Sequence, residues 1–459
     1  MEQHTKRLPL WRKLGYGVGD FGANFCWTFS ASFMMLYFTN VLGISTAVIG
    51  TLIMISKFLD GITDVFMGSI IDHTKSRMGK GRFWLFVSSI PLAVCTYLLF
   101  NVPAGFSDGT KYGYIFIVYT LMGAVFYTMN NIAYSTLMAL CSKDPRDRVQ
   151  MGSFRYIFAI LSGVVIQYVT SDLVQAFGGG QQGWRAVSLI FAIVCFVSFM
   201  IPVLCVRELP EEELNENKRS KAKENGDLSL FDTLKMILRN KYFVLILLYY
   251  FFMYLFSFIS SGLGIFYATY CLGKPSVFGS IGLCSYIPTV IVLLMVAKIT
   301  GKYGIRRSAF MGHCVALIGA IIALLGGLAN AVPVLLIGLF IRGLGIAPMS
   351  GSVNALIAAT DDYSELTTGR RMTGAFFSCS SVGIKVGTGV GTAVCGFLLD
   401  LGKVDGTLAE QAASTVAVIK WSYLIPNVLF PVATLIILSF LDVEDTVKKL
   451  RTDILQAQG

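Results

Sequence analysis

Long apolar runs recur from one end of the chain to the other, and they constrain the fold more than any other feature of the sequence. A transmembrane helix needs about 20 consecutive, predominantly apolar residues, and runs of this length recur throughout the chain. Only 14% of the 459 residues are charged, whereas a soluble domain carries about 25%. The pattern predicts an all-α polytopic membrane protein and argues against a soluble protein with buried helices.

We predict twelve transmembrane helices, with boundaries accurate to a few residues. Several of the runs exceed about 20 residues, so we expect tilted helices or extensions beyond the bilayer. The predicted spans are 14–41, 46–71, 82–101, 113–141, 148–170, 184–205, 241–270, 276–299, 306–328, 332–360, 372–400 and 414–441.

Basic residues gather at the N-terminus and in every second connection, for example Arg77 and Arg82 after the second span. The alternate connections hold few, such as Lys111 and Lys274. Because cytoplasmic loops carry the excess of Lys and Arg, both termini are expected in the cytoplasm and the protein in the cell (inner or plasma) membrane. These loops also explain the net charge of +10, so nucleic acid is not expected as a partner; the lipid bilayer is.

A polar stretch from Arg207 to Asn240 divides the spans equally. We expect an N-terminal six-helix half (1–205), a cytoplasmic linker (206–240), a C-terminal six-helix half (241–441) and a cytoplasmic tail (442–459), although a merely long loop would also fit. The loop Gly68–Arg82 has a reduced counterpart at 298–307, as two parallel repeats would give. Together these features resemble the major facilitator superfamily. In the first loop, Asp72 and the arginines Arg77 and Arg82 are expected to latch cytoplasmic helix ends as a gate.

Charged residues interrupt the second span. Lys57, Asp60 and Asp64 are spaced by three and four residues, so they share one helix face. A carboxylate at bilayer depth costs at least about 2.5–3.5 kcal/mol. Two carboxylates one turn apart also repel each other, so a proton, a basic partner or a bound cation must compensate them. The stretch predicts a site on an ion path, and a structural salt bridge with a lysine is the alternative.

Helical rise places other polar residues at matching depths. Thr128 on the fourth span and Lys385 on the eleventh are expected near the level of Asp60. Asp60, Asp64 and the Thr128 hydroxyl would supply hard oxygen ligands for Na⁺, Li⁺ or a proton. Lys385 would neutralise a carboxylate when the cation is absent.

A second, adjoining set offers the groups that a polar solute needs. The level of Asp64 is expected to match those of Asp20 and Asn131, with Arg155 contributing from the fifth span. Tyr134 and Trp27 would supply ring faces, because ligand sites combine apolar walls with a few polar groups. The alternatives are an interfacial charge at Asp20, snorkelling of Arg155 to the cytoplasm, helix-joining polar residues and packing aromatics. Arg342 falls near mid-depth on the tenth span without an evident partner.

At these residues the chain resembles the glycoside–pentoside–hexuronide:cation symporter family, which includes the melibiose and glucuronide carriers. The resemblance rests on Gly15–Asp20, Leu59–Asp64, Asp72–Arg82, Thr128–Ile132, Arg155, and Asp362–Glu365 with Arg371 and Lys385. It implies a cation site at Asp60, Asp64 and Thr128 with Lys385 as charge partner and a basic residue at Lys57. It also implies sugar-site roles for Asp20, Asn131 and Arg155. Arg371 joins the expected cytoplasmic gate.

The chain departs from the melibiose carrier at two positions of this pattern. That carrier has aspartate where this chain has Asn131, and tryptophan where it has Ser135. The loss of the acid argues against galactoside specificity and looks more like the glucuronide-type carriers. Asparagine would also suit an anionic sugar, with Arg155 or Arg371 as the counter-charge.

The sequence therefore predicts a secondary active transporter that couples a sugar or glycoside, with a hexuronide as one candidate, to a cation by alternating access. A carrier of lysolipids or drugs with the same fold is the alternative. A membrane-embedded enzyme fits less well, because no Walker, HExxH or GxSxG motif occurs and both aspartates lie on one helix. With ten scattered cysteines and three scattered histidines, no metal beyond Na⁺ and no cofactor is expected. Such a fold can work as a monomer.

Overall fold

The computed structural model describes residues 8–142, 145–209, 239–368, 373–406, 408 and 410–458. Some helical side chains, including those of Asp64 and Asp72, also lie outside the described set. The described chain is helical and forms two compact units. The first comprises Met1–Glu216, Ser261–Gly282 and Thr392–Ile419, and the second comprises Asn217–Ser260, Leu283–Gly391 and Lys420–Gly459.

Eleven helices among the described residues are long and apolar enough to cross a membrane. They match eleven of the twelve predicted spans. The remaining span, 46–71, is the long helix α2, Thr46–His73, which includes side chains outside the described set and is not counted among the eleven. The all-α polytopic prediction is confirmed.

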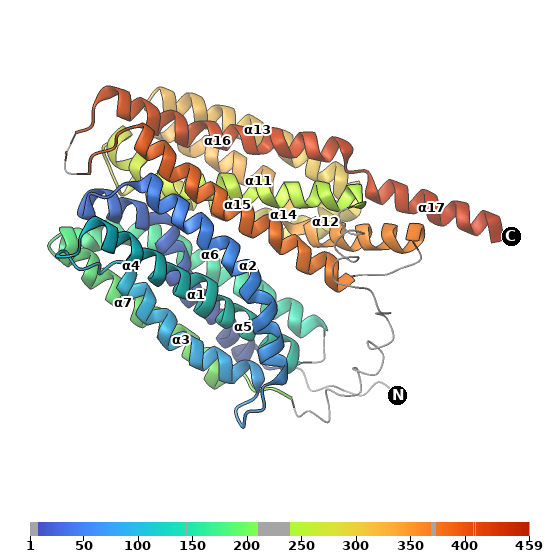
Figure 1. Cartoon of the computed structure of the whole chain (residues 1–459). Helices are drawn as coiled ribbons and strands as arrows, with labels where there is room; N and C mark the ends of the chain where they lie inside the picture. The colour runs from blue at the N-terminus through green and yellow to red at the C-terminus, as the bar shows by residue number, and fades with distance from the viewer. Residues whose placement is uncertain are drawn as a thin grey trace. The chain divides into compact units, whose positions relative to one another are not determined.

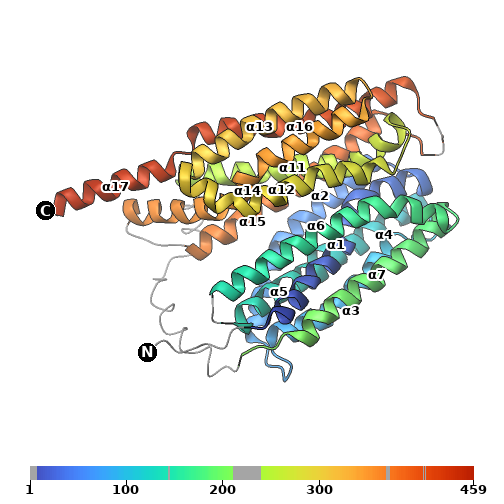
Figure 2. The ribbon, with the colours of Figure 1, turned by 180° about the vertical axis from the view of Figure 1, so that it is seen from behind.

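The first unit is built around α1 (Figure 1). α1 packs along α6 and α7, α3 packs against α5 and α7, and α2 packs against α4 and α5; Figure 2 shows α6 and α7 running alongside α1. The helices with their bounds are α1 (Leu10–Tyr37), α2 (Thr46–His73), α3 (Lys80–Leu99), α4 (Asp108–Thr120), α5 (Thr128–Cys141), α6 (Pro145–Ala176) and α7 (Gly180–Cys205). The π-helical segment η1 (Phe38–Leu42) extends α1.

The span predicted at 113–141 is interrupted in its middle. A π-helical segment, η2 (Leu121–Tyr127), separates α4 from α5. Each π-helical turn holds more residues than an α-helical turn, and such segments often occur at functional sites. The hydropathy pattern did not predict this interruption, because it changes the hydrogen bonding of the backbone and not the polarity of the side chains.

The remaining α-helices either lie in the second unit or have residues in both units. They are α11 (Lys241–Phe266), continued by the π-helical η4 (Tyr267–Cys271), α12 (Val277–Tyr303), α13 (Ile305–Leu328), α14 (Val332–Thr368), α15 (Thr373–Leu401), α16 (Ala413–Phe440) and α17 (Val443–Gln458). α13 and α14 pack closely, because a Cβ at Gly319 would lie only 2.7 Å from the Gly338 carbonyl oxygen. Small residues permit such an approach between membrane helices. α17 packs against α14 and leads to the C-terminus (Figure 1).

The starts of α3 and α13 are built alike. The Glu208 carboxylate accepts two backbone N–H groups of the first turn of α3, each at 2.9 Å. The Arg82 guanidinium donates to the Val203 carbonyl oxygen of α7 at 2.8 and 2.6 Å. In the second unit, Glu444 accepts the Arg306 N–H at 2.9 Å, and the Arg306 guanidinium donates to carbonyl oxygens at the end of α16. Carboxylates satisfy free N–H groups at helix starts, and arginines satisfy carbonyls at helix ends.

Candidate functional site

The carboxylate of Asp60 lies buried in the middle of α2, beside the start of α5. The Thr128 hydroxyl donates to Asp60 Oδ1 at 2.6 Å. Only 7% of Asp60 and 4% of Thr128 is exposed. Thr128, which was expected only at the depth of Asp60, therefore contacts it directly and places a hydroxyl oxygen against a carboxylate oxygen away from bulk water.

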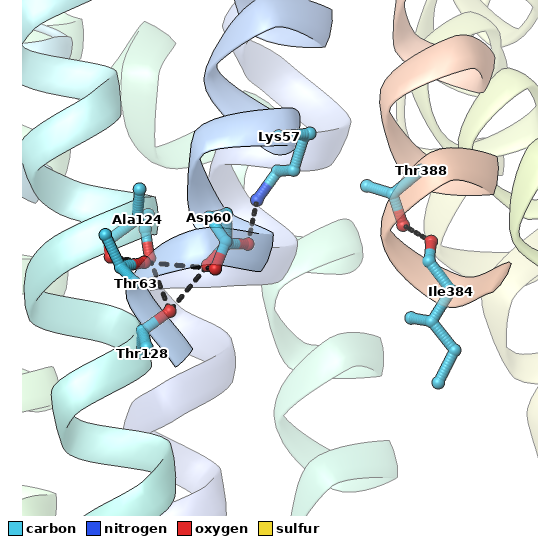
Figure 3. Close-up of polar contacts among 8 residues, drawn as sticks. Lys57, Asp60, Thr63, Ala124, Thr128, Ile384 and Thr388 are labelled. Atoms are coloured by element: carbon cyan, nitrogen blue, oxygen red, sulfur yellow. Dashed lines mark hydrogen bonds and ion pairs between the residues drawn. The ribbon is translucent and has the colours of Figure 1, made fainter. Parts of the chain in front are cut away.

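Lys57 lies on the other side of the same carboxylate. Its Nζ is 3.5 Å from Asp60 Oδ2, and Figure 3 shows the ammonium group directed at the carboxylate. The Nζ also lies 4.0 Å from the centroid of the Trp27 ring and 5.5 Å from that of Tyr119. Aromatic faces attract a nearby ammonium group, more strongly where water is excluded. The Lys57 ammonium group is thus stabilised both by a carboxylate and by two aromatic rings.

The π-helical segment η2 adds backbone oxygens to this site. The Thr63 hydroxyl donates to the Ala124 carbonyl oxygen at 2.5 Å and also lies 3.0 Å from the Asp60 carbonyl oxygen. The Thr128 hydroxyl also lies 3.3 Å from the Gly123 carbonyl oxygen. Figure 3 shows these groups converging between α2 and the η2–α5 helix. Carboxylate, hydroxyl and carbonyl oxygens are hard ligands, which suit hard cations such as Na⁺.

A second charged pair joins α1 to α6. Arg155 Nε lies 2.6 Å from Asp20 Oδ2, and Arg155 Nη2 lies 3.2 Å from Asp20 Oδ1. Two parallel N–H···O bonds give this pair a fixed orientation. Arg155 Nη1 also reaches the Ser135 hydroxyl at 3.4 Å. Both charged side chains are mostly buried, with 19% of Arg155 and 17% of Asp20 exposed. The structure thus brings together two residues that the sequence placed in one substrate site.

Aromatic rings border this pair on one side. Tyr134 is 1% exposed, and its ring centroid is 4.4 Å from the Arg155 guanidinium. Its hydroxyl donates to the Tyr16 carbonyl oxygen, and Tyr16 donates back to the Tyr134 carbonyl oxygen at 2.7 Å. This burial favours a supporting role for Tyr134 over direct contact with a ligand. Trp27 stacks on Tyr127 at 4.8 Å, and Asn131 lies beside Tyr127 with its own side chain exposed.

A family described as MFS/sugar transport protein matches residues 15–445. The chain belongs to this family. The members are membrane transporters, so the hypothesis of a membrane-embedded enzyme is excluded. The transporter is 28% identical over 99% of its length to the isoprimeverose transporter of Lactiplantibacillus pentosus, covering 93% of that protein. It is also 28% identical over 87% of its length to the glucuronide carrier protein homolog of Escherichia coli K12, covering 85% of that protein.

Solved structures support the same fold. The crystal structure of a D-xylose-proton symporter matches with a TM-score of 0.61 at 14% identity, over 92% of the transporter and 95% of that chain. At this identity the likeness shows the fold alone. The major facilitator prediction is confirmed by the family and by this fold.

The roles predicted for several residues of the transporter stay predictions. The side chains of Asp64 and Asp72 lie outside the described residues, and so does Arg371. Lys385 lies on α15 in the second unit, whereas Asp60 lies in the first. Arg77 is exposed, while Arg82 holds the end of α7 as described above.

The sequence reasoning missed three contributors to the first unit's site. Thr63 is three residues from Asp60, so the spacing already placed it on the same helix face, but no role was assigned to it. Tyr119 precedes η2 and Tyr127 is its last residue, and no sequence signal singled them out among the 20 tyrosines. Among the described residues, no group of three or more His, Cys, Asp or Glu side chains could hold a metal ion.

Proposed function

We propose that the transporter moves a sugar or glycoside into the cell by symport with a monovalent cation, Na⁺, Li⁺ or H⁺. The observation that carries the proposal is the buried Asp60 carboxylate, which has a hydroxyl on one oxygen and a lysine on the other. Intramembrane carboxylates mark ion and proton paths. The family and the sugar-transporting relatives support the sugar as cargo.

The cation would bind among Asp60, Thr128 and Thr63, with the carbonyl oxygens of η2 beside them and Asp64 as a second carboxylate. Lys57 would balance Asp60 in the absence of the cation. When the cation enters, Lys57 would shift toward Trp27 and Tyr119, whose faces already lie near its ammonium group. Lys385 is a further proposed charge partner. Exchange of one positive charge for another keeps the buried carboxylate compensated throughout.

The sugar would bind beside this site, at Asp20, Arg155 and Asn131, with Trp27 as a ring platform. Trp27 is near both sites, because its ring contacts Lys57 on one side and stacks on Tyr127 on the other. A cation that displaces Lys57 would therefore change the position of Trp27 and the affinity for the sugar. Such coupling is reciprocal, so the sugar would raise the affinity for the cation to the same degree.

The orientation is part of the proposal. We place both termini in the cytoplasm of the cell membrane, with halves at 1–205 and 241–441 joined by the linker 206–240 and followed by the tail 442–459. The Arg82–Glu208 arrangement then lies on the cytoplasmic side. There it would hold helix ends together as a gate, with Asp72, Arg77 and Arg371 as its further members. The transporter can work as a monomer.

The test is uptake into oriented membrane vesicles. The panel would contain radiolabelled α- and β-galactosides, xylosides, glucosides and glucuronides, each under an imposed Na⁺ gradient and an imposed H⁺ gradient. Accumulation of one class that collapses when one gradient is dissipated is the expected result, and it identifies both solute and ion. Absence of uptake of every sugar, from protein shown to be inserted, would contradict the proposal.

A further inference from the structure

Arg342 has no use in the proposed cation and sugar sites, although it lies deep in the membrane. It is the eleventh residue of α14, ten residues after Val332, which places it about 15 Å from that helix end. The hydrocarbon core is about 30 Å thick, so the guanidinium starts near the midplane. Arginine at that depth is rare and almost always faces the bundle interior or a water-filled cavity.

The charge of Arg342 is not neutralised within the described part of the chain. Its Nε is fully buried and has no hydrogen-bond acceptor, and no described carboxylate pairs with it. The side chains within electrostatic range are Tyr286 of α12, Tyr423 of α16 and His313 of α13. These groups are polar, and none of them supplies the negative charge that a guanidinium in the membrane requires.

His313 adds a second unsatisfied group to the same region. It is 0% exposed, and its Nδ1 lies 2.9 Å from the Ala309 carbonyl oxygen. Nδ1 therefore carries the proton, and Nε2 is left without a hydrogen-bond partner among the described residues. Buried polar atoms nearly always have partners. Two such atoms on neighbouring helices, one of them on a cation, leave hydrogen-bonding capacity that a ligand could use.

The backbone around Arg342 is held in place. A Cβ at Gly343 would lie 2.6 Å from the Ser285 carbonyl oxygen, so α14 touches α12 directly at the next residue. The Thr289 hydroxyl donates to the Gly343 carbonyl oxygen at 3.0 Å. On its other side, α14 packs against Gly319 of α13. These contacts fix the backbone from which the guanidinium extends, and a guanidinium can bind a carboxylate through two parallel hydrogen bonds.

We propose that Arg342 binds the carboxylate of the transported solute, with Tyr286, Tyr423 and His313 around it, so that the substrate is a hexuronic acid or its glycoside. Two other cations deep in the described helices have carboxylates already: Arg155 is held by Asp20, and Lys57 lies against Asp60. A planar carboxylate matches the guanidinium fork. This inference rests on the proposed sugar symport and names its substrate class.

The test is equilibrium binding to the purified, full-length transporter by calorimetry. Two ligands differ only at carbon 6: p-nitrophenyl β-glucuronide carries a carboxylate there, and p-nitrophenyl β-glucoside carries a hydroxymethyl group. Wild type is expected to prefer the glucuronide. Arg342→Gln should weaken glucuronide binding about 10- to 150-fold, the range for hydrogen bonds to charged groups, and leave the glucoside unchanged. Arg342→Lys should retain part of the preference.

Arg185→Gln is the matched control, because Arg185 contacts the Asn101 side chain at an exposed position; it should change neither affinity. Equal affinity of wild type for both ligands, or an equal loss of both in Arg342→Gln, would overturn the inference. If Arg342→Gln does not fold, the inference is tested by the ligand preference of wild type and by Tyr286→Phe. Because Tyr286 is 37% exposed, its substitution is expected to leave the fold intact. Tyr286→Phe should lower only the glucuronide affinity.

Phosphate is the other oxyanion that the Arg342 guanidinium could bind. Inorganic phosphate and lysophosphatidylglycerol would be titrated in the same way. Binding of either that depends on Arg342, without binding of the glucuronide, would overturn the carboxylate assignment. Gradient-driven uptake of the glucoside without glucuronide binding would overturn this inference and leave the symport intact. Uptake of neither sugar would overturn the symport itself.

Discussion

The membrane-embedded charges are balanced differently in the two units. In the first, two described cations within the helices have an aspartate beside them, Lys57 with Asp60 and Arg155 with Asp20. In the second, Arg342 has only tyrosines and a histidine within range among the described residues. A paired charge is stable without a ligand and must be released to bind one, whereas an unpaired charge is stabilised by its ligand.

The difference assigns distinct tasks to the two regions. The first unit's lysine–carboxylate pair suits the coupling cation, because Lys57 can give up its place to another positive charge. Arg342 suits the anionic group of a solute, because nothing within the described unit competes for it. At the helix starts the units are alike, since Glu208 and Glu444 cap α3 and α13 in the same manner. The contrast is therefore confined to the groups proposed to bind ligands.

The largest effect is expected from Asp60→Asn, which removes the carboxylate while keeping its shape. Gradient-driven accumulation should be lost, because the cation no longer has its charged ligand, while exchange of labelled for unlabelled sugar at equal concentrations should persist. Both are measured in the same vesicles. Asp108→Asn is the control, since the Asp108 side chain is 74% exposed, and it should change neither rate. Accumulation at the wild-type level in Asp60→Asn would show that the first unit's pair is structural.

The Asp20–Arg155 pair gives the next largest effect. Removing either partner leaves a buried charge uncompensated, which costs about 3–5 kcal/mol. Asp20→Asn and Arg155→Gln should each lower the thermal unfolding midpoint in detergent, and the double variant should be more stable than the two losses added together predict. Sugar binding should stay weak in the double variant. Normal sugar affinity in the stable double variant would make the pair a helix tie and not a sugar contact.

Lys57→Met tests the exchange of charges directly. The methionine side chain is similar in length to the aliphatic part of lysine. It carries no charge, so it cannot compete with a cation for Asp60. The coupling-cation concentration for half-maximal sugar uptake should fall, by about 5-fold or more if the competition is worth a typical coupling energy. Lys111→Met is the matched control, because Lys111 lies in the first turn of α4 and pairs with the exposed Asp108. A higher cation requirement in Lys57→Met would show that Lys57 assists cation binding instead of opposing it.

The sequence predicted much of the first unit's site and less of its detail. Spacing by three and four residues put Lys57 and Asp60 on one face, and counting at the helical rise brought Thr128 to the same depth. These arguments work because a membrane helix has a fixed rise and few polar residues. The roles of Tyr119 and Tyr127 depend on η2, and a change from α-helical to π-helical bonding leaves no mark in hydropathy.

The sequence could not decide the surroundings of Arg342 either. Its depth followed from counting, but the neighbours Tyr286, His313 and Tyr423 come from three other helices, and their rotation about the helix axes is set by packing. The sequence predicts Arg155 as one counter-charge for an anionic sugar. The structure shows instead that Arg155 forms two hydrogen bonds with Asp20. Choosing between Arg155 and Arg342 therefore required the structure.

A smaller effect is expected at the base of the first unit, outside the membrane span of α6. Burial disfavours the charged form of Asp147, but the Leu8 N–H, Lys13 and Ser142 outweigh it and hold the pKa of Asp147 below its usual value. Stability from this group is therefore present above the unfolded pKa of about 3.9 and is lost as pH falls through the lower folded pKa. Asp147→Asn should reduce the fall of the unfolding midpoint as pH decreases from about 5 to 3. An unchanged dependence of the midpoint on pH in this range would contradict this role of Asp147.

The smallest effects are expected at the two caps, where the units are alike. Glu208→Ala and Glu444→Ala should each cost about 0.5–2 kcal/mol, as loss of a helix cap does. Glu208 accepts two N–H groups of α3, whereas Glu444 accepts one of α13, so Glu208→Ala should cost more. Hydrogen exchange should rise in the first turn of α3 for the former and of α13 for the latter. Equal costs, with exchange rising in both turns, would mean that these caps act as one coupled element and not separately in each unit.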